Sequence, residues 1–158
     1  MIYLDHLTTT PPLTEVVDAM QPWLRGQFGA PASLHKLGLE ARDAIDAARE
    51  RLAKLVNAAE PEEIIFTSSG TEAINHAVKG AALANRRFGS HIVTTGIEHP
   101  AVLGSIAWLE SQGFSSTRVG VDGQGRVDPD ALGRAMTDET IPVCLHHANL
   151  DLGTMQPV

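Results

Sequence analysis

The sequence has few aromatic residues, a single cysteine and no long apolar run. Phe, Trp and Tyr make up 4% of the 158 residues, so the core must be built mostly from Ala, Val, Ile and Leu. The single cysteine, Cys144, excludes an internal disulfide and a cysteine-rich metal site. No stretch of about 18 apolar residues is present, which argues against a membrane span.

Basic residues are also scarce. Twelve Lys and Arg stand against 19 Asp and Glu, the net charge is -7, and the basic residues are dispersed along the chain. Nucleic-acid-binding domains cluster them, so we expect no nucleic-acid partner. The chain starts Met-Ile-Tyr-Leu-Asp-His, without the basic segment and apolar run of a secretory signal. We therefore expect a cytoplasmic protein.

Apolar periodicity predicts helices followed by alternating strands and helices. Helical spacing predicts helices over residues 13–24 and 38–57. Strands are then predicted over 63–67, 91–95, 116–121 and 141–146, separated by helices over about 72–88, 99–112 and 128–136. This alternation predicts an α/β layer with a mostly parallel sheet. We expect an N-terminal arm with a short strand in residues 1–12, and one domain over residues 13–158.

The turn over residues 67–72 is a candidate phosphate site. It links an apolar run to the start of a predicted helix, where free backbone N–H groups and the positive end of the helix dipole favour an anion. Gly70 allows close approach of the backbone, and Thr71 adds a hydroxyl donor. The alternative is that the Ser and Thr residues here only cap the helix. The turn matches neither a P-loop nor the dinucleotide glycine pattern.

Two histidine-containing segments follow predicted strands. His99 comes after Glu98 at the carboxyl end of a strand, the edge where ligands bind in parallel α/β sheets. It could stack on a planar cofactor and move protons, or lie in solvent at a helix start. His146 and His147 are adjacent and would point to opposite faces of a strand, so we expect no metal site there. Cys144 lies in an apolar stretch, which favours a buried small side chain over a nucleophile.

Six blocks of sequence, in order over essentially the whole chain, resemble the cysteine desulfurases. The opening block is Tyr-Leu-Asp-His-Leu-Thr-Thr-Thr-Pro, and the candidate phosphate turn and the Glu98-His99 pair fall in two others. The blocks cover residues 3–11, 28–38, 65–75, 79–82, 98–103 and 149–157. Cysteine desulfurases are fold-type-I enzymes that use pyridoxal 5'-phosphate (PLP).

The resemblance implies a partial large domain of a fold-type-I PLP-dependent transferase, with three α/β/α layers. It implies sulfur transfer from L-cysteine, giving alanine and a persulfide passed to a sulfur-acceptor protein, as in iron–sulfur cluster assembly. It also implies a homodimer, or a complex with a second chain that completes the site. Gly70 and Thr71 would hold the cofactor phosphate, and His99 would stack on the ring and assist proton transfer. Asn149, in the Asn-Asn-Glu-like block, is a further cofactor-binding candidate.

Departures from the family pattern qualify this expectation. Leu150 replaces the second Asn of the family's Asn-Asn-Glu, and Ala30 stands where the family has Asn. None of the three lysines, Lys36, Lys54 and Lys79, lies in a segment like the family's Ser-x-His-Lys, which supplies the Schiff-base lysine. The family's cysteine-bearing loop is not matched either. We therefore expect a truncated or split protein that is inactive alone.

Two other functions remain open from the sequence. One is a non-catalytic module that binds a full-length desulfurase or a sulfur-transfer partner. The other is a different fold-type-I enzyme, such as a class V aminotransferase or a selenocysteine lyase. Without the rest of such a protein, apolar helix faces should be exposed, so we expect self-association.

Overall fold

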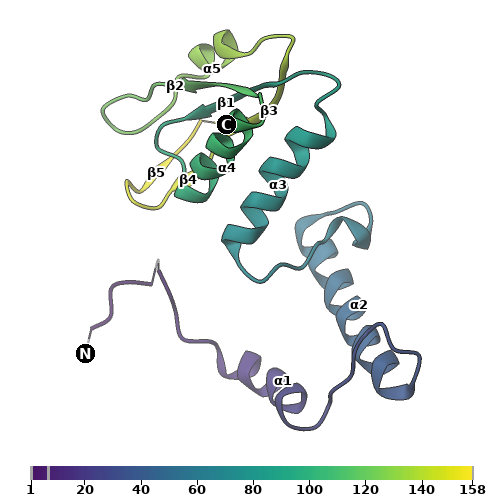
Figure 1. Ribbon diagram of the computed structural model, residues 1–158. Helices are drawn as coiled ribbons and strands as arrows, with labels where there is room; N and C mark the ends of the chain where they lie inside the picture. The colour runs from purple at the N-terminus through teal and green to yellow at the C-terminus, as the bar shows by residue number, and fades with distance from the viewer. Residues whose placement is uncertain (1, 7, 158) are drawn as a thin grey trace. The chain divides into compact units, whose positions relative to one another are not determined.

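The computed structural model describes residues 2–6 and 8–157. The chain forms two compact units, which divide between Phe66 and Thr67 (Figure 1). The first unit is helical, and the second contains a parallel sheet with helices.

The first unit contains helices α1 (Thr14–Arg25) and α2 (Lys36–Val56) and a short 3-10 helix, η1 (Pro61–Glu63). The predictions of helices over residues 13–24 and 38–57 are confirmed by α1 and α2. The Nδ1 atom of His35 accepts a hydrogen bond from the N–H of Gly38 at the start of α2, and α2 ends at Asn57 in the left-handed conformation. Residues 2–6 contain no strand, and Met1 and Leu7, also in the expected N-terminal arm, lie outside the described residues.

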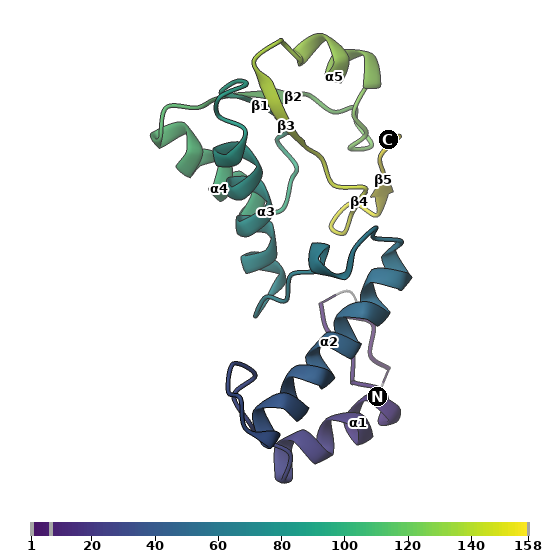
Figure 2. The same ribbon diagram turned by 90° about the vertical axis from the view of Figure 1, so that its right-hand side faces the viewer.

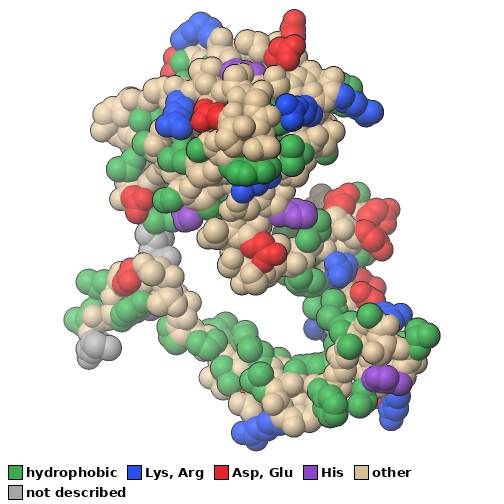
Figure 3. Space-filling view, viewed as in Figure 1, with side chains coloured by type: hydrophobic (Ala, Val, Ile, Leu, Met, Phe, Trp, Pro, Cys, Tyr) green, Lys and Arg blue, Asp and Glu red, His purple; other side chains and the backbone are tan. Residues whose placement is uncertain are grey.

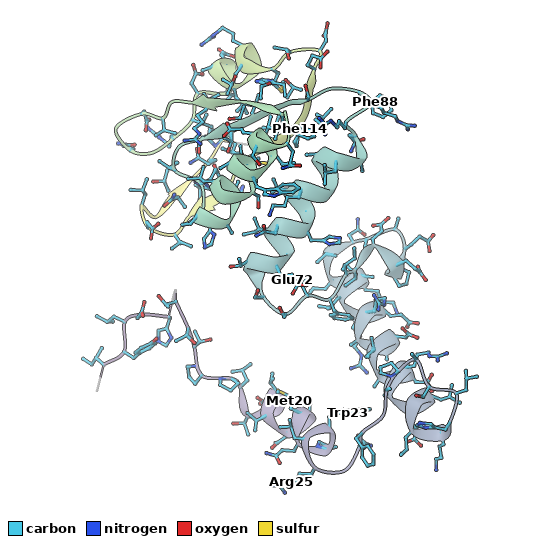
Figure 4. The ribbon with its side chains drawn as sticks, viewed as in Figure 1. Met20, Trp23, Arg25, Glu72, Phe88 and Phe114 are labelled. Atoms are coloured by element: carbon cyan, nitrogen blue, oxygen red, sulfur yellow. The ribbon has the colours of Figure 1, made fainter. Side chains whose placement is uncertain are left out.

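The first unit has almost no core of its own. Within its described residues, only Gly38, Ala41 and Ala53 are buried. The apolar face of α1 is open, with Met20 50% exposed and Leu24 72% exposed. Apolar side chains accordingly appear along the surface of this unit in Figure 3, and Met20 and Trp23 extend from α1 in Figure 4.

The prediction of a strand over residues 63–67 is wrong. Residues 61–63 form η1, and the segment after it is irregular. Instead of pairing with another strand, this segment contacts Arg49 of α2. The carbonyl of Ile64 accepts a hydrogen bond from the Arg49 guanidinium. The central carbon of that guanidinium lies 5.2 Å from the centre of the Phe66 ring. Ile65 and Phe66 are 60% and 48% exposed, so their apolar run is not buried as a central strand would require.

The second unit confirms the predicted α/β class. Helix α3 (Gly70–Ala84) precedes β1 (His91–Thr95), and α4 (Pro100–Ser111) and α5 (Pro129–Ala135) alternate with β2 (Ser115–Val119) and β3 (Thr140–Cys144). The strands form one parallel sheet in the order β2-β1-β3, so β1 is central. A hairpin, β4 (Ala148–Asn149) with β5 (Thr154–Met155), was not predicted.

Alternate side chains of β1 fill two core layers, one on each face of the sheet. Ile92 packs with Ala82, Ile106, Leu109 and Phe114 from the side of α3 and α4. Val93 packs with Val119 and Val127, and with partly buried residues of α5, on the other side. Figure 2 shows α3 and α4 on one face of the sheet and α5 on the other. This gives the expected α/β/α layers.

One side-chain contact marks the end of α3, and another links the strands of the sheet. Helix α3 ends four residues before the predicted position 88, because Asn85 adopts a non-helical conformation and its side chain bonds the Ala81 carbonyl. Buried His91, at the start of β1, links the three strands, with ring nitrogens 2.7 Å from the hydroxyl of Thr140 in β3 and 2.9 Å from that of Thr117 in the middle of β2. Among the described helices, none is both long enough and apolar enough to cross a bilayer.

We predict that the isolated chain self-associates through the apolar face of α1. A Met20→Gln, Leu24→Gln double substitution should weaken association, because full burial of such side chains gains about 1.5–3 kcal/mol each. Sedimentation velocity over a range of concentrations measures this, and Asp18→Asn, on a different face of the same helix, is the matched control. A monomer at every concentration that binds no apolar-surface dye would refute the prediction.

Candidate functional site

The candidate site lies at the carboxyl edge of the parallel sheet, within the second unit. Strand β1 ends at Thr95 and its neighbour β3 ends at Cys144. Because the two strands are parallel, the loops that follow them, residues 96–99 and 145–147, leave the sheet at the same edge. This edge brings His99 close to the segment that contains Asn149.

His99 and Asn149 line one small pocket, together with His146 and Leu150. The pocket has a volume of about 50 Å³. Pockets that enclose a cofactor-sized ligand hold roughly 300–1,000 Å³. The pocket is therefore too small to enclose a cofactor by itself. Gly70 and Thr71 are not among the lining residues.

The His99 imidazole is exposed and has a defined tautomer. His99 is the N-cap of α4, and its Nδ1 atom accepts a hydrogen bond of 3.1 Å from the N–H of Ala101. Nδ1 is therefore unprotonated, and in the neutral ring the proton lies on Nε2. Pro100 occupies the first turn of α4, where its missing N–H costs nothing. The neutral form of His99 thus presents its ring face and one N–H donor.

Asn149 is buried, and its side-chain amide is occupied by backbone groups. The Nδ2 atom donates to the carbonyl of Ile97 at 3.0 Å. The Oδ1 atom accepts from the N–H groups of Asp151 and Leu152 at 2.9 and 2.8 Å. These bonds fix the turn between β4 and β5 and tie it to the loop before His99. A cofactor contact by Asn149 stays a prediction, and it would compete with these bonds.

The N-terminus of α3 has the donors that a phosphate needs. The Ser69 hydroxyl caps the helix by accepting from the N–H of Glu72, and the first intrahelical bond runs from Ala73 to the carbonyl of Ser69. The N–H groups of Gly70 and Thr71 precede that bond and are free of the helix ladder. A Cβ atom placed on Gly70 would meet nothing within 4 Å, so the approach is open. The residues fit a phosphate ester here.

Glu72 lies at the same end of α3 (Figure 4). Its carboxylate accepts hydrogen bonds from the hydroxyl of Ser68 at 2.5 Å and from the N–H of Ser68 at 2.7 Å. These two bonds, that of the hydroxyl first, lower the pKa of Glu72. Ser68 is therefore committed to Glu72, and Gly70 and Thr71 remain as the donors for an anion.

Cys144 is partly buried at the end of β3. Burial, and secondarily the charge of Glu98, raise the pKa of its thiol. A nucleophilic cysteine needs the opposite environment. The structure thus supports the expectation that Cys144 is not a catalytic residue.

Sequence reasoning missed a buried polar network beside His99. Glu98 is 6% exposed, and its carboxylate contacts His146, which in turn contacts Gln156. The sequence did contain a signal for this network: an acidic residue in the turn between a buried strand and a helix. His146 and His147, considered above as metal ligands, differ in burial, and the described residues contain no group of three or more His, Cys, Asp or Glu that could hold a metal ion.

The family model for class-V aminotransferases matches residues 2–158. The chain belongs to this family. The resemblance to cysteine desulfurases is confirmed by curated relatives: a cysteine desulfurase IscS of Dictyoglomus turgidum is 47% identical over 99% of this chain, and one of Methanosarcina thermophila is likewise 47% identical over 99%. The chain spans 40% of the length of the first relative and 39% of the length of the second.

Solved structures of family members agree with the fold. A NifS-like protein superimposes with a TM-score of 0.89 at 37% identity, over 95% of this chain and 41% of its own. A structure described as SspA in complex with cysteine gives a TM-score of 0.90 at 35% identity, over 98% of this chain and 44% of its own.

The lowered pKa of Glu72 predicts a pH-dependent cap on α3. Its bonds to Ser68 stabilise the helix start while the carboxylate is ionised. That contribution is present above the ordinary glutamate pKa and is lost as the pH falls through the lowered value. The amide proton resonance of Ser68 should report this in an NMR pH titration, with a midpoint below the usual glutamate range. Glu72→Gln should abolish the titration, and the control Glu62→Gln should leave it intact. A midpoint at or above the ordinary value would contradict the assignment.

The raised pKa of Cys144 predicts slow alkylation. Iodoacetamide should react with the native thiol more slowly than with the urea-unfolded chain at neutral pH, because less thiolate is present and access is restricted. Glu98→Gln should shift the alkylation profile to lower pH by removing a nearby negative charge. Glu110→Gln on α4 is the control for the added amide. Equal native and unfolded rates would overturn the prediction.

Proposed function

We propose that this chain supplies the phosphate-binding and ring-stacking part of a PLP site in a cysteine desulfurase. The observation that carries the proposal is the exposed His99 ring at the carboxyl edge of the sheet, in the same compact unit as the open N-terminus of α3. The identity of 47% with cysteine desulfurases supports the substrate class, L-cysteine, with alanine as product.

Each residue has a separate task in this proposal. The N–H groups of Gly70 and Thr71, with the Thr71 hydroxyl, hold the phosphate at the positive end of α3. The face of His99 covers one side of the pyridine ring, and its Nε2–H can donate a hydrogen bond to a neighbouring acceptor. Leu150, 53% exposed, adds an apolar wall in the pocket where the family has an asparagine.

The cofactor, when bound, supplies the electron sink on which the family's chemistry depends. The reaction also requires the family's lysine. Lys79 does not take that place: it lies within α3, and its ammonium is 4.9 Å from the centre of the Trp108 ring. We therefore infer that these 158 residues do not form alanine from L-cysteine by themselves.

The remaining parts of the proposal concern partners and place. A second copy or a second chain would complete the site, and a sulfur-acceptor protein would take the persulfide. The exposed apolar face of α1 is in keeping with a chain that associates. A cytoplasmic location stays a prediction from the sequence.

The cofactor proposal predicts binding of pyridoxamine 5'-phosphate, which has the ring and phosphate of PLP but cannot condense with the chain's lysines. Titration followed by the absorbance of the ring should show saturable binding of one molecule per chain. Thr71→Val should weaken binding by about tenfold through loss of a hydrogen bond to a charged phosphate. His99→Ala should weaken it through loss of stacking on the ring.

The matched controls separate the phosphate from the ring. Pyridoxamine without phosphate should bind weakly and should not respond to Thr71→Val. His76→Ala removes an exposed histidine from the same helix as Thr71 and should leave binding unchanged. Absence of saturable binding, or equal binding of both ligands, would remove the proposal and favour a non-catalytic binding module.

A further inference from the structure

Glu98 carries a buried carboxylate with no cationic Lys or Arg partner in the described part of the chain. Its Oε1 atom accepts from the hydroxyl of Thr95 at 2.6 Å. Its Oε2 atom accepts from the backbone N–H of His146 at 2.9 Å, and the Nδ1 atom of His146 also lies 2.9 Å away. Burying an ionised carboxylate is costly unless hydrogen bonds compensate, so these contacts keep the loop after β1 in one arrangement.

Gln156 determines the tautomer of His146. Its Oε1 atom accepts from the N–H of Val127 at 2.9 Å, and its Nε2 atom donates to the carbonyl of Gly125 at 2.8 Å. These two backbone groups fix which end of the amide is which. The Gln156 Nε2 atom lies 3.2 Å from the His146 Nε2 atom, and an amide nitrogen can only donate. His146 Nε2 is therefore the acceptor, and in the neutral ring the proton lies on Nδ1.

The proton on Nδ1 faces Glu98. The 2.9 Å between His146 Nδ1 and Glu98 Oε2 is a hydrogen-bond distance. The imidazole ring is turned out of line, however, so that Nδ1 lacks a well-aligned acceptor. The His146 side chain is 16% exposed, and a small rotation of its ring would align Nδ1–H with the carboxylate. Glu98, His146 and Gln156 thus lie in contact in one row, with the Glu98–His146 pair at hydrogen-bond distance.

The row of contacts from Glu98 to Gln156 affects His99, because His99 follows Glu98 directly in the sequence. Ile97 and Glu98 are both tied to the opposite loop, through Asn149 Nδ2 to the Ile97 carbonyl and through His146 N–H to Glu98. His99 lies between these anchors and the first turn of α4 and is exposed. Within residues 2–6 and 8–157, its side chain bonds only to its own helix cap. We propose that Glu98, supported by His146 and Gln156, is a positioning residue that fixes the His99 ring at the pocket. This inference rests on the proposed role of His99 in cofactor binding.

The first test needs no variant. Long-range ¹H–¹⁵N NMR spectra of the histidine rings should show His146 protonated on Nδ1 and bare on Nε2, and His99 the reverse. A His146 ring with its proton on Nε2 would overturn the proposal, because Gln156 could not then donate to it. This result does not depend on whether the chain binds a cofactor.

The second test is Glu98→Gln, with Glu98→Asp as the conservative variant and His147→Gln as the control at an exposed neighbour of His146. In Glu98→Gln the His146 Nδ1 resonance should shift while Gln156 keeps the tautomer, the His99 ring resonances should shift, and affinity for pyridoxamine 5'-phosphate should fall about tenfold, the loss expected for a charge-assisted hydrogen bond. Glu98→Asp should restore the signals in part. His147→Gln should change none of them.

The outcomes separate this inference from the proposed function. If the native chain binds pyridoxamine 5'-phosphate and Glu98→Gln changes neither the affinity nor the His99 ring signals, the positioning role is wrong. If Glu98→Gln shifts the His99 signals but the native chain binds no pyridoxamine 5'-phosphate, the positioning role stands and the cofactor proposal fails.

Discussion

Burial of β1 between two helical layers is the constraint on which the second unit depends. All five residues of this strand are buried, and its parallel neighbours leave no edge of it open. Ile92 and Val93, side by side in the sequence, fill opposite core layers. Because β1 is held on both faces and both edges, the loop at its carboxyl end starts from a fixed point, and that loop carries Glu98 and His99.

The site therefore depends on two kinds of interaction in succession. Apolar packing fixes the strand, and a buried polar network then fixes the loop that follows. Glu98 bonds to Thr95 within the loop and to His146 across the edge of the sheet, while Asn149 bonds to Ile97. The first unit is different, because its apolar helix faces are exposed and its buried residues are few and small.

Much of the second unit could be predicted from the sequence, because short runs rich in β-branched residues alternate with longer apolar segments of helical length. The strand at residues 91–95 and the helix after it are examples. The strand predicted over residues 63–67 failed because an apolar run needs a pairing partner, which sequence periodicity does not reveal. The network of Glu98, His146 and Gln156 could not be predicted, because its contact between Glu98 and His146 joins residues 48 positions apart through the fold. Gly70 and Thr71 became candidates because they lie at a helix start, and His99 because it follows a strand at the carboxyl edge of the sheet. For Asn149, the sequence indicated the block but not the backbone bonds that occupy its amide.

The central claim is that the cofactor half-site lies within residues 67–158, between the start of α3 and the carboxyl edge of the sheet. The most direct test is to map backbone amide shifts in ¹H–¹⁵N spectra as pyridoxamine 5'-phosphate is added. The account predicts that the largest changes fall at Gly70 and Thr71 and around His99, with residues 2–66 little affected. Changes confined to residues 2–66, or scattered without a focus at these positions, would contradict it.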